Sequence, residues 1–225
     1  LVDNDALNLA EAGIDPKVLI NNTTYPINVV QRVDTPIRIE LDLFETENTL
    51  VRRPEAIEYA YDQLESVIMG HRNTLKSTTG AKAAHAYAPD SDTPDTPIIQ
   101  TSGAAFNGRK RLMVEDILYL KERFDNADIP PEKRILVLHP SHLTDLILFD
   151  VKAFKSITDF VNGKPNRLAG FGVLEFSKMA YYDSSLNKKA FNSAPVAGDT
   201  LSSFAFQGDE VMKADGSVHM YATMD

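Results

Sequence analysis

Two histidines flank a proline and a serine at residues 139–142, where His139-Pro140-Ser141-His142 follows four aliphatic residues. Imidazole nitrogens bind divalent metals and move protons near neutral pH, so this pair is the first candidate for chemistry. Its spacing fits no common helical metal-binding pair, and no glutamate lies beside it to act as a base. Ser141 can instead cap a helix that begins after it, and His139 is biased toward an extended backbone by the following proline. The pattern therefore favours a strand-to-helix corner over a reactive site.

A second candidate is the stretch 103–111, GAAFNGRKR, which follows a predicted strand and precedes a predicted helix, as a phosphate-binding loop does. Such a loop needs lysine and then serine or threonine after its last glycine. Here Arg109 and Lys110 follow Gly108, so the hydroxyl that would hold magnesium is missing. We interpret Arg109-Lys110-Arg111 as a solvated loop, and a nucleotide-binding enzyme built on residues 103–111 stays a less favoured alternative.

Three aspartates, Asp90, Asp92 and Asp95, imitate the start of a calcium loop, but Pro94 stands at a ligand position and the closing glutamate is missing. The chain contains no cysteine, which excludes disulfides, thiolate zinc sites and cysteine nucleophiles. No nucleophile elbow or dinucleotide-binding glycine pattern is present. We therefore assign no catalytic, cofactor-binding or metal-binding residue and expect that the protein is not an enzyme.

The composition is that of a globular protein, with 225 residues, 43% of them hydrophobic, and a formal net charge of −9. Basic residues form no stripe that could neutralise successive phosphates, so a dedicated DNA-binding face is not expected. No apolar run reaches the length of a membrane span, and we expect a soluble intracellular product. The first residue is leucine, from which we expect that an N-terminal segment is missing.

The first half of the chain predicts an arm, a β-hairpin and a long helix. Residues 1–24 are acidic and weakly periodic, and we interpret them as an arm. Hydrophobic residues alternate at 25–29, Asp34-Thr35-Pro36 predicts a turn, and IRIELDLF at 37–44 alternates without a fault, which together predict a hairpin. Pro54 to about Ser77 shows an apolar stripe at the helical period.

The second half follows a stretch rich in proline and aspartate at 87–100, which predicts a linker. Hydrophobic patterning then predicts helices at 113–124 and 141–149 around a buried strand at 134–140. Further strands are expected at 167–177, 202–207 and 218–224. The fold class is α+β.

One face of the predicted hairpin is hydrophobic, and we expect no other segment of its own chain to cover it. Its second strand places Ile37, Ile39, Leu41 and Leu43 on one side. Burying them would contribute on the order of 6 to 10 kcal/mol before entropy is subtracted, and an isolated two-stranded ribbon is marginal in water. We expect a neighbouring subunit to cover it, with nearby charges setting register and partner choice. The expected subunit interface comprises Ile37, Arg38, Ile39, Glu40, Leu41, Asp42, Leu43, Arg52 and Arg53.

The order of these segments resembles the major capsid proteins of tailed bacteriophages with the Hong Kong 97 phage fold. RVDTPIRIELDLFETENTLVRR resembles that family's extended loop, and PEAIEYAYDQLESVIMGHRNTL resembles the long spine helix of its peripheral domain. LMVEDILYLKERFDNADIPPEKRILVLHPSHLTDLI is similar to a helix, strand and helix of its axial domain, and NRLAGFGVLEFS and SSFAFQGDEVMKA are similar to its later strands. The resemblance implies an arm (1–24), an extended β-hairpin loop (25–53), a spine helix (54–88), a linker (89–100), an axial domain (101–200) and late strands returning to the peripheral domain (201–225).

The resemblance further implies a structural subunit that forms pentamers and hexamers and closes into the icosahedral head shell of a tailed phage or prophage. It implies assembly in the bacterial cytoplasm, with scaffolding and portal proteins as possible partners, and a shell that encloses DNA without sequence-specific binding and has no membrane contact. No cofactor is implied. An encapsulin-like cellular compartment that stores a cargo enzyme is the alternative within the same fold.

Overall fold

The computed structural model describes residues 2–3, 6–11, 13, 17–50, 63–94, 96–149, 158–159, 164–165, 167–209 and 211. The chain divides into two compact units, which are described separately: the first comprises Leu1–Glu45 and Lys213–Asp225, and the second Thr46–Met212. No helix within the described ranges is long and apolar enough to cross a membrane.

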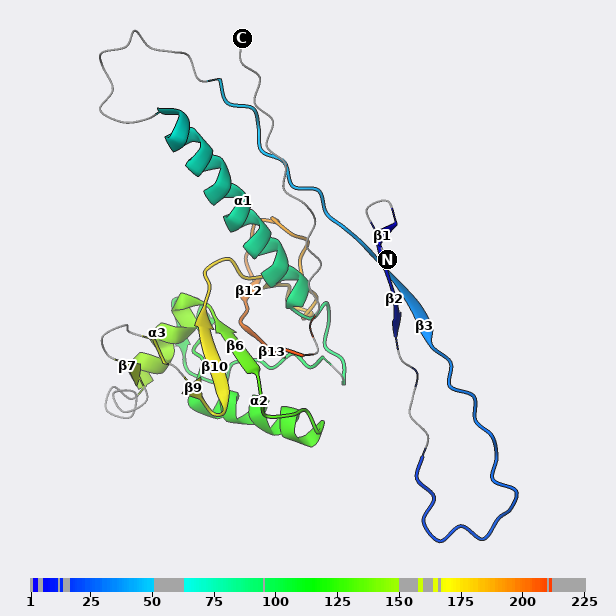
Figure 1. The fold of residues 1–225 in the computed structure, drawn as a ribbon. Helices are drawn as coiled ribbons and strands as arrows, with labels where there is room; N and C mark the ends of the chain where they lie inside the picture. Colours follow the sequence, from blue (N-terminus) through cyan, green and yellow to red (C-terminus); the bar gives the residue numbers. More distant parts are fainter. Residues whose placement is uncertain are drawn as a thin grey trace. The chain divides into compact units, whose positions relative to one another are not determined.

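The first unit contains a three-stranded antiparallel ribbon (Figure 1). Its strands are β1 (Val2–Asp3), β2 (Ala6–Glu11) and β3 (Thr35–Glu40), in the order β1-β2-β3. β2 pairs with β3 over its full length, with Leu7 opposite Ile39 and Leu9 opposite Ile37. The ribbon is therefore a hairpin whose connection is the long segment between Glu11 and Thr35.

This pairing corrects the predicted hairpin. The partner of β3 is ALNLAE at residues 6–11, and not residues 25–29, which carry no strand. Asp34-Thr35-Pro36 is not the turn, because Thr35 and Pro36 are the first residues of β3. The predicted strand at 37–44 ends at Glu40. Residues 6–11 alternate too, and the pairing partner lies across a long loop, so local turn signals pointed to the wrong neighbour.

The second unit contains three helices and a mixed sheet among its described residues. The helices are α1 (Gln63–Tyr87), α2 (Val114–Asn126) and α3 (Pro140–Phe149). The main sheet has the order β13-β6-β10-β9, formed by β6 (Arg134–Leu138), β9 (Arg167–Leu168), β10 (Phe171–Glu175) and β13 (Phe204–Gln207). Short pairs are formed by β4 (Ala105–Phe106) with β5 (Arg109–Lys110), β7 (Thr158–Asp159) with β8 (Lys164–Pro165), and β11 (Tyr181–Tyr182) with β12 (Thr200–Leu201).

The central strand β6 has helices on both of its faces, which explains its unbroken aliphatic run. It pairs parallel with β10 and antiparallel with β13. One core cluster contains Leu136 and Leu138 of β6 together with residues of both helices and of two neighbouring strands: Ile117 of α2, Leu143 and Leu146 of α3, Leu168 of β9, Phe171 of β10, and Leu112, which precedes α2. A second cluster places Val137 with Ala84 of α1, Met179 and Phe204. Alternate residues of β6 thus hold α2 and α3 on one face and the end of α1 on the other.

Helix α1 contacts this core only near its C-terminal end. Its buried residues among those described are Ala81 and Ala84, and Ala88 follows the helix, whereas residues 64–77 are exposed or half-buried. The Lys188 ammonium donates to the backbone carbonyls of His85 (3.0 Å) and Ala88 (2.7 Å) and lies 2.7 Å from Asp90. A cation is favourable at a helix C-terminus, where carbonyls lack helical partners, so Lys188 fixes the end of α1.

The second half of the sequence was predicted well. The predicted helices and strand correspond to α2, α3 and β6, and Leu143 and Leu146 of α3 are buried. α1 continues ten residues beyond the expected end at Ser77, and its predicted start at Pro54 lies outside the described residues. The predicted strand at 218–224 also lies outside them, and the predicted linker at 89–100 falls within the second unit. A mixed helix and sheet fold is confirmed.

Candidate assembly surfaces

The ribbon carries most of the residues expected at a subunit interface. Residues 37–40 lie in β3, residues 41–43 continue directly from it, and Arg52 and Arg53 lie outside the described residues. Ile37 and Ile39 are each 40% exposed and Leu43 is 83% exposed, while Leu41 is half-buried. Every residue of β3 is exposed, so the described part of the chain places no core under either face.

The loop between β2 and β3 is a larger apolar surface that the sequence analysis missed. Figure 1 shows this segment as a long excursion from the ribbon. Its exposed hydrophobic residues are Val18, Leu19, Ile20, Tyr25, Ile27, Val29, Val30 and Val33, with Val29 98% exposed. The signal was present as a hydrophobic run with only Lys17, Arg32 and Asp34 as charges in 17–34, but it was divided between an arm and a strand.

The base of this loop is closed by Asp34. Its Oδ1 accepts the backbone N–H of Gly13 (2.9 Å) and the Nε–H of Arg32 (3.1 Å). A Cβ at Gly13 would lie 2.3 Å from the carbonyl oxygen of Val33, so only glycine permits this approach of the two chain segments. The loop therefore has a defined neck even though its apolar side chains face solvent.

The His139-Pro140-Ser141-His142 corner is a strand-to-helix junction, as predicted. Ser203 Oγ accepts the backbone N–H of His139 (3.0 Å) and lies 2.7 Å from His142 Nδ1. Ser141 is not the cap, because α3 begins one residue earlier; its N–H instead donates to His139 Nδ1 (3.1 Å). No group of three metal-ligating side chains exists among the described residues.

His142 is 5% exposed and electrically neutral at ordinary pH. Burial and, to a lesser extent, the nearby Arg109 guanidinium lower the pKa of His142 to about 4. Together with Ser203 and Asp145, His142 supplies the residue types of a catalytic triad. Asp145, however, is occupied elsewhere: it accepts bonds from Arg109 and the Leu112 N–H, so its carboxylate cannot orient the imidazole.

Arg109 is a structural residue and not part of a solvated loop, which corrects the sequence interpretation. It forms a bidentate ion pair with Asp145 and also donates to the Ser141 carbonyl (3.0 Å). Burial raises the pKa of Asp145, but the bonds from Arg109 and the Leu112 N–H outweigh it, so this pKa lies below its usual value. The sequence could not reveal a partner 36 residues away.

The stretch 103–111 is a β-hairpin and not a phosphate loop. β4 and β5 are joined by Asn107 (φ 48°) and Gly108 (φ 76°), both left-handed, as a type I′ turn requires. The Asn-Gly pair was a readable hairpin signal. Arg111 lies over the Phe106 ring at 4.2 Å, so the guanidinium groups of Arg109 and Arg111 are both held by contacts within the fold.

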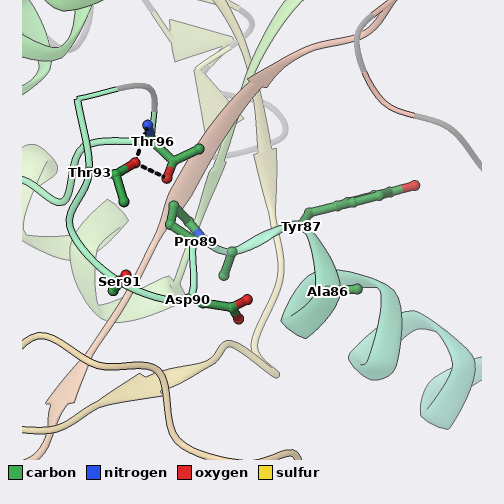
Figure 2. Close-up of a pocket in the computed structure, with 8 residues that line it drawn as sticks. Ala86, Tyr87, Pro89, Asp90, Ser91, Thr93 and Thr96 are labelled. Atoms are coloured by element: carbon green, nitrogen blue, oxygen red, sulfur yellow. Dashed lines mark hydrogen bonds between the residues drawn. The ribbon is translucent and has the colours of Figure 1, made fainter. Parts of the chain in front are cut away.

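A shallow hollow of about 400 Å³ lies where α1 ends (Figure 2). It is lined by Ala86, Tyr87, Ala88, Pro89, Asp90, Ser91, Thr93 and Thr96. The hydroxyls of Thr93 and Thr96 bond to each other (2.8 Å), and Asp90 is paired with Lys188. These polar groups satisfy one another, so the hollow offers no convergent set of groups for a ligand.

Comparison with known proteins gives matches in structure alone. No protein-family model and no curated protein matches the sequence. The capsid structure of cyanophage P-SCSP1u matches with a TM-score of 0.60 and 14% identity over 88% of this chain. The mature capsid of bacteriophage PhiM1 matches with a TM-score of 0.54 and 12% identity over 82%. A structure from Mycobacterium phage Che8 also matches, with a TM-score of 0.54 and 14% identity over 80%.

The chain shares its fold with phage capsid proteins. It spans 63%, 70% and 62% of the chains from P-SCSP1u, Che8 and PhiM1, respectively.

Proposed function

We propose that this chain is the major capsid protein of a tailed phage or prophage, with the Hong Kong 97 phage fold. Copies of it form pentamers and hexamers that close into an icosahedral head shell assembled in the bacterial cytoplasm. The observation that carries the proposal is the fold shared with the P-SCSP1u capsid across 88% of this chain. A shell subunit works through geometry: contacts that close by rotation give rings, and curved packing of rings gives a container.

The parts of the fold take distinct roles in this proposal. The β2–β3 ribbon with its loop is the extended loop, α1 is the spine helix, and the sheet around β6 with α2 and α3 is the axial domain. At 25 residues α1 is about 37 Å long at 1.5 Å per residue, which suits a strut in a shell wall. Scaffolding and portal proteins are the further partners, and the shell encloses DNA without reading its sequence.

The ribbon is the part we propose to dock on a neighbouring subunit. Ile37 and Ile39 are 40% exposed and Leu43 83% exposed, so covering the three would contribute about 4 kcal/mol at 1.5 to 3 kcal/mol for a fully buried side chain. The exposed valines and isoleucines of the loop at 17–34 add to this surface. A large exposed apolar surface on a single chain marks a site of association.

Replacing Ile39 and Leu41 together with aspartate tests the role of the ribbon. The full chain is concentrated, alone and with scaffold, and observed by negative-stain microscopy and light scattering. We expect rings, sheets or shells from the unaltered protein and none from the variant, whose circular dichroism stays unchanged. Val196→Asp, which places a carboxylate at another exposed valine in the second unit, is the control and should assemble.

Three results would contradict the proposal. Loss of the whole circular-dichroism signal in the variant would show that the ribbon belongs to the core of the subunit. An unaltered protein that stays monomeric at every concentration and with scaffold would not be a shell subunit. A shell that copurifies with a packaged enzyme would instead indicate a cellular compartment.

A further inference from the structure

Strand β3 is an edge strand within the described part of the first unit. The sheet order β1-β2-β3 leaves one side of β3 without a partner among these residues (Figure 1). An edge strand presents a row of backbone N–H and C=O groups that can pair with another strand. Charged side chains normally deter such pairing, so the charges on β3 decide which partner can bind.

The two charges of β3 are not matched within the ribbon. Arg38 lies opposite Asn8, and Glu40 lies opposite Ala6. Neither Arg38 nor Glu40 forms a salt bridge with a residue of the described ranges. Both are exposed, so they are available to a strand that brings opposite charges.

We propose that the edge of β3 that is unpaired among the described residues pairs with β3 of a second copy, antiparallel and about a two-fold axis, with Ile39 opposite Ile39. This register places Arg38 of each copy opposite Glu40 of the other. On the other face it places Ile37 of each copy opposite Leu41 of the other. Opposite charges and apolar pairs directly across a sheet are both stabilising, so one strand sequence complements itself.

Other registers lose this match. Moving the second strand by two residues in one direction opposes Arg38 to Arg38, which is destabilising. Moving it by two residues in the other direction opposes Glu40 to Glu40, and the Arg38–Asp42 pairs that form there use a residue that follows the end of β3. Moving it by one residue opposes Ile37 or Ile39 to a charged side chain. In a parallel pair in register, Arg38 would lie beside Arg38 and Glu40 beside Glu40, which places like charges next to each other and is destabilising. Pro36, which has no N–H to donate, falls beyond the paired residues, opposite Asp42.

A two-fold contact of this kind is satisfied by two copies and does not propagate. The place of this contact in a shell rests on the proposed function. The edge-to-edge contact would join subunits in pairs, whereas the apolar face of the same ribbon docks on another neighbour. The edge and the face of β3 thus serve two different contacts.

Cysteine cross-linking tests the register, because the chain has no cysteine of its own. Residues opposite each other in an antiparallel pair have Cα atoms about 4.5 to 5.5 Å apart, within the range of a disulfide. Ile39→Cys should therefore give a covalent dimer on a non-reducing gel after mild oxidation of the full-length protein. Ile37→Cys is the matched control, equally 40% exposed, but its two copies would be about 14 Å apart at 3.4 Å per residue over four residues. We expect at least a tenfold lower dimer yield from it.

Charge exchange on the Ile39→Cys background tests the partner. Arg38→Glu opposes Glu to Glu at both pairs and Glu40→Arg opposes Arg to Arg, so each should lower the dimer yield several-fold. A mixture of the two variants restores opposite charges between unlike copies, and the mixed dimer should form as readily as the parent. Equal cross-linking at residues 37 and 39, or no recovery in the mixture, would overturn the pairing.

These results separate this inference from the proposed function. Shells without an Ile39→Cys dimer would reject the β3 pairing and leave the capsid role intact. Specific dimers from a protein that never forms rings or shells would support the pairing and reject the capsid role.

Discussion

The ion pair between Arg109 and Asp145 predicts a large and specific loss of stability when it is broken. Arg109→Ala removes the guanidinium from a carboxylate whose side chain is 1% exposed. The Leu112 N–H, at 3.1 Å, then remains as a donor to that carboxylate. The hairpin β4–β5 also loses its attachment to α3 at the Ser141 carbonyl.

The magnitude follows from the burial of the two partners. Removing one partner of a buried pair costs about 3 to 5 kcal/mol, because the other charge is left without compensation. The Arg109 side chain is 23% exposed, so solvent already screens part of the interaction and the lower end applies. We expect Arg109→Ala to lower the free energy of unfolding by about 3 kcal/mol, a fall of about 1 M in the urea midpoint.

Urea unfolding followed by circular dichroism at low protein concentration measures this change. Lys121→Ala is the control, since Lys121 and Asp125 form an equally close pair whose side chains are both 42% exposed. It should cost about 0.5 kcal/mol or less. Adding Asp145→Asn to Arg109→Ala should recover about 1 kcal/mol or more, because a neutral amide needs no counter-charge. Equal losses for Arg109→Ala and Lys121→Ala would refute the reasoning.

Three further predictions concern other positions of the second unit. Burial holds the pKa of His142 at about 4, below its ordinary 6.5, so the unfolded chain takes up the proton first as the pH falls. The free energy of unfolding should therefore fall by up to about 3 kcal/mol between pH 6.5 and 4, and the urea midpoint of His142→Gln should fall less over this range than that of the unaltered protein. Thermal melts should show that Gly70→Ala in α1 stabilises the protein by about 0.5 to 1 kcal/mol, whereas Gly108→Ala, at φ 76°, destabilises it by about 1 kcal/mol. A Cβ meets nothing within 4 Å at either site, so stability changes of the same sign would contradict a cause in the backbone conformation. Lys188→Met should cost about 1 to 3 kcal/mol and speed amide exchange at the end of α1, while unchanged exchange would show that the ammonium does not fix the helix end.

Segments with strong local periodicity could be predicted from the sequence. α2, β6 and α3 follow from amphipathic or aliphatic patterns whose residues face one core. α1 ran past its expected end through Thr78, Thr79 and Gly80, which have low helix propensity, because Ala81 and Ala84 pack on the core. Tertiary packing outweighed local preference there.

Long-range pairings could not be predicted in the same way. β3 pairs with β2 across the loop at 17–34, and neither strand sequence contains a signal that identifies its partner. Arg109 found Asp145, and Ser203 joined His139 and His142 across 64 and 61 residues. Of the expected interface, the alternation of residues 37–43 was readable from the sequence. The alternation at 25–29 in the exposed loop predicted a strand instead, because a short alternating run looks the same whether or not it finds a partner strand.

The position of β13 beside β6 links the order of synthesis to the order of folding. β6, α3 and β10 are made first, and Ser203 leaves the ribosome 64 residues after the His139 whose N–H it binds. Until Phe204 to Gln207 arrive, one edge of an aliphatic strand stays open and His142 lacks the hydroxyl that it contacts. Chains that end before residue 204 would therefore be prone to aggregation and to proteolysis. Formation of β13 thus distinguishes chains that have completed this sheet from truncated ones.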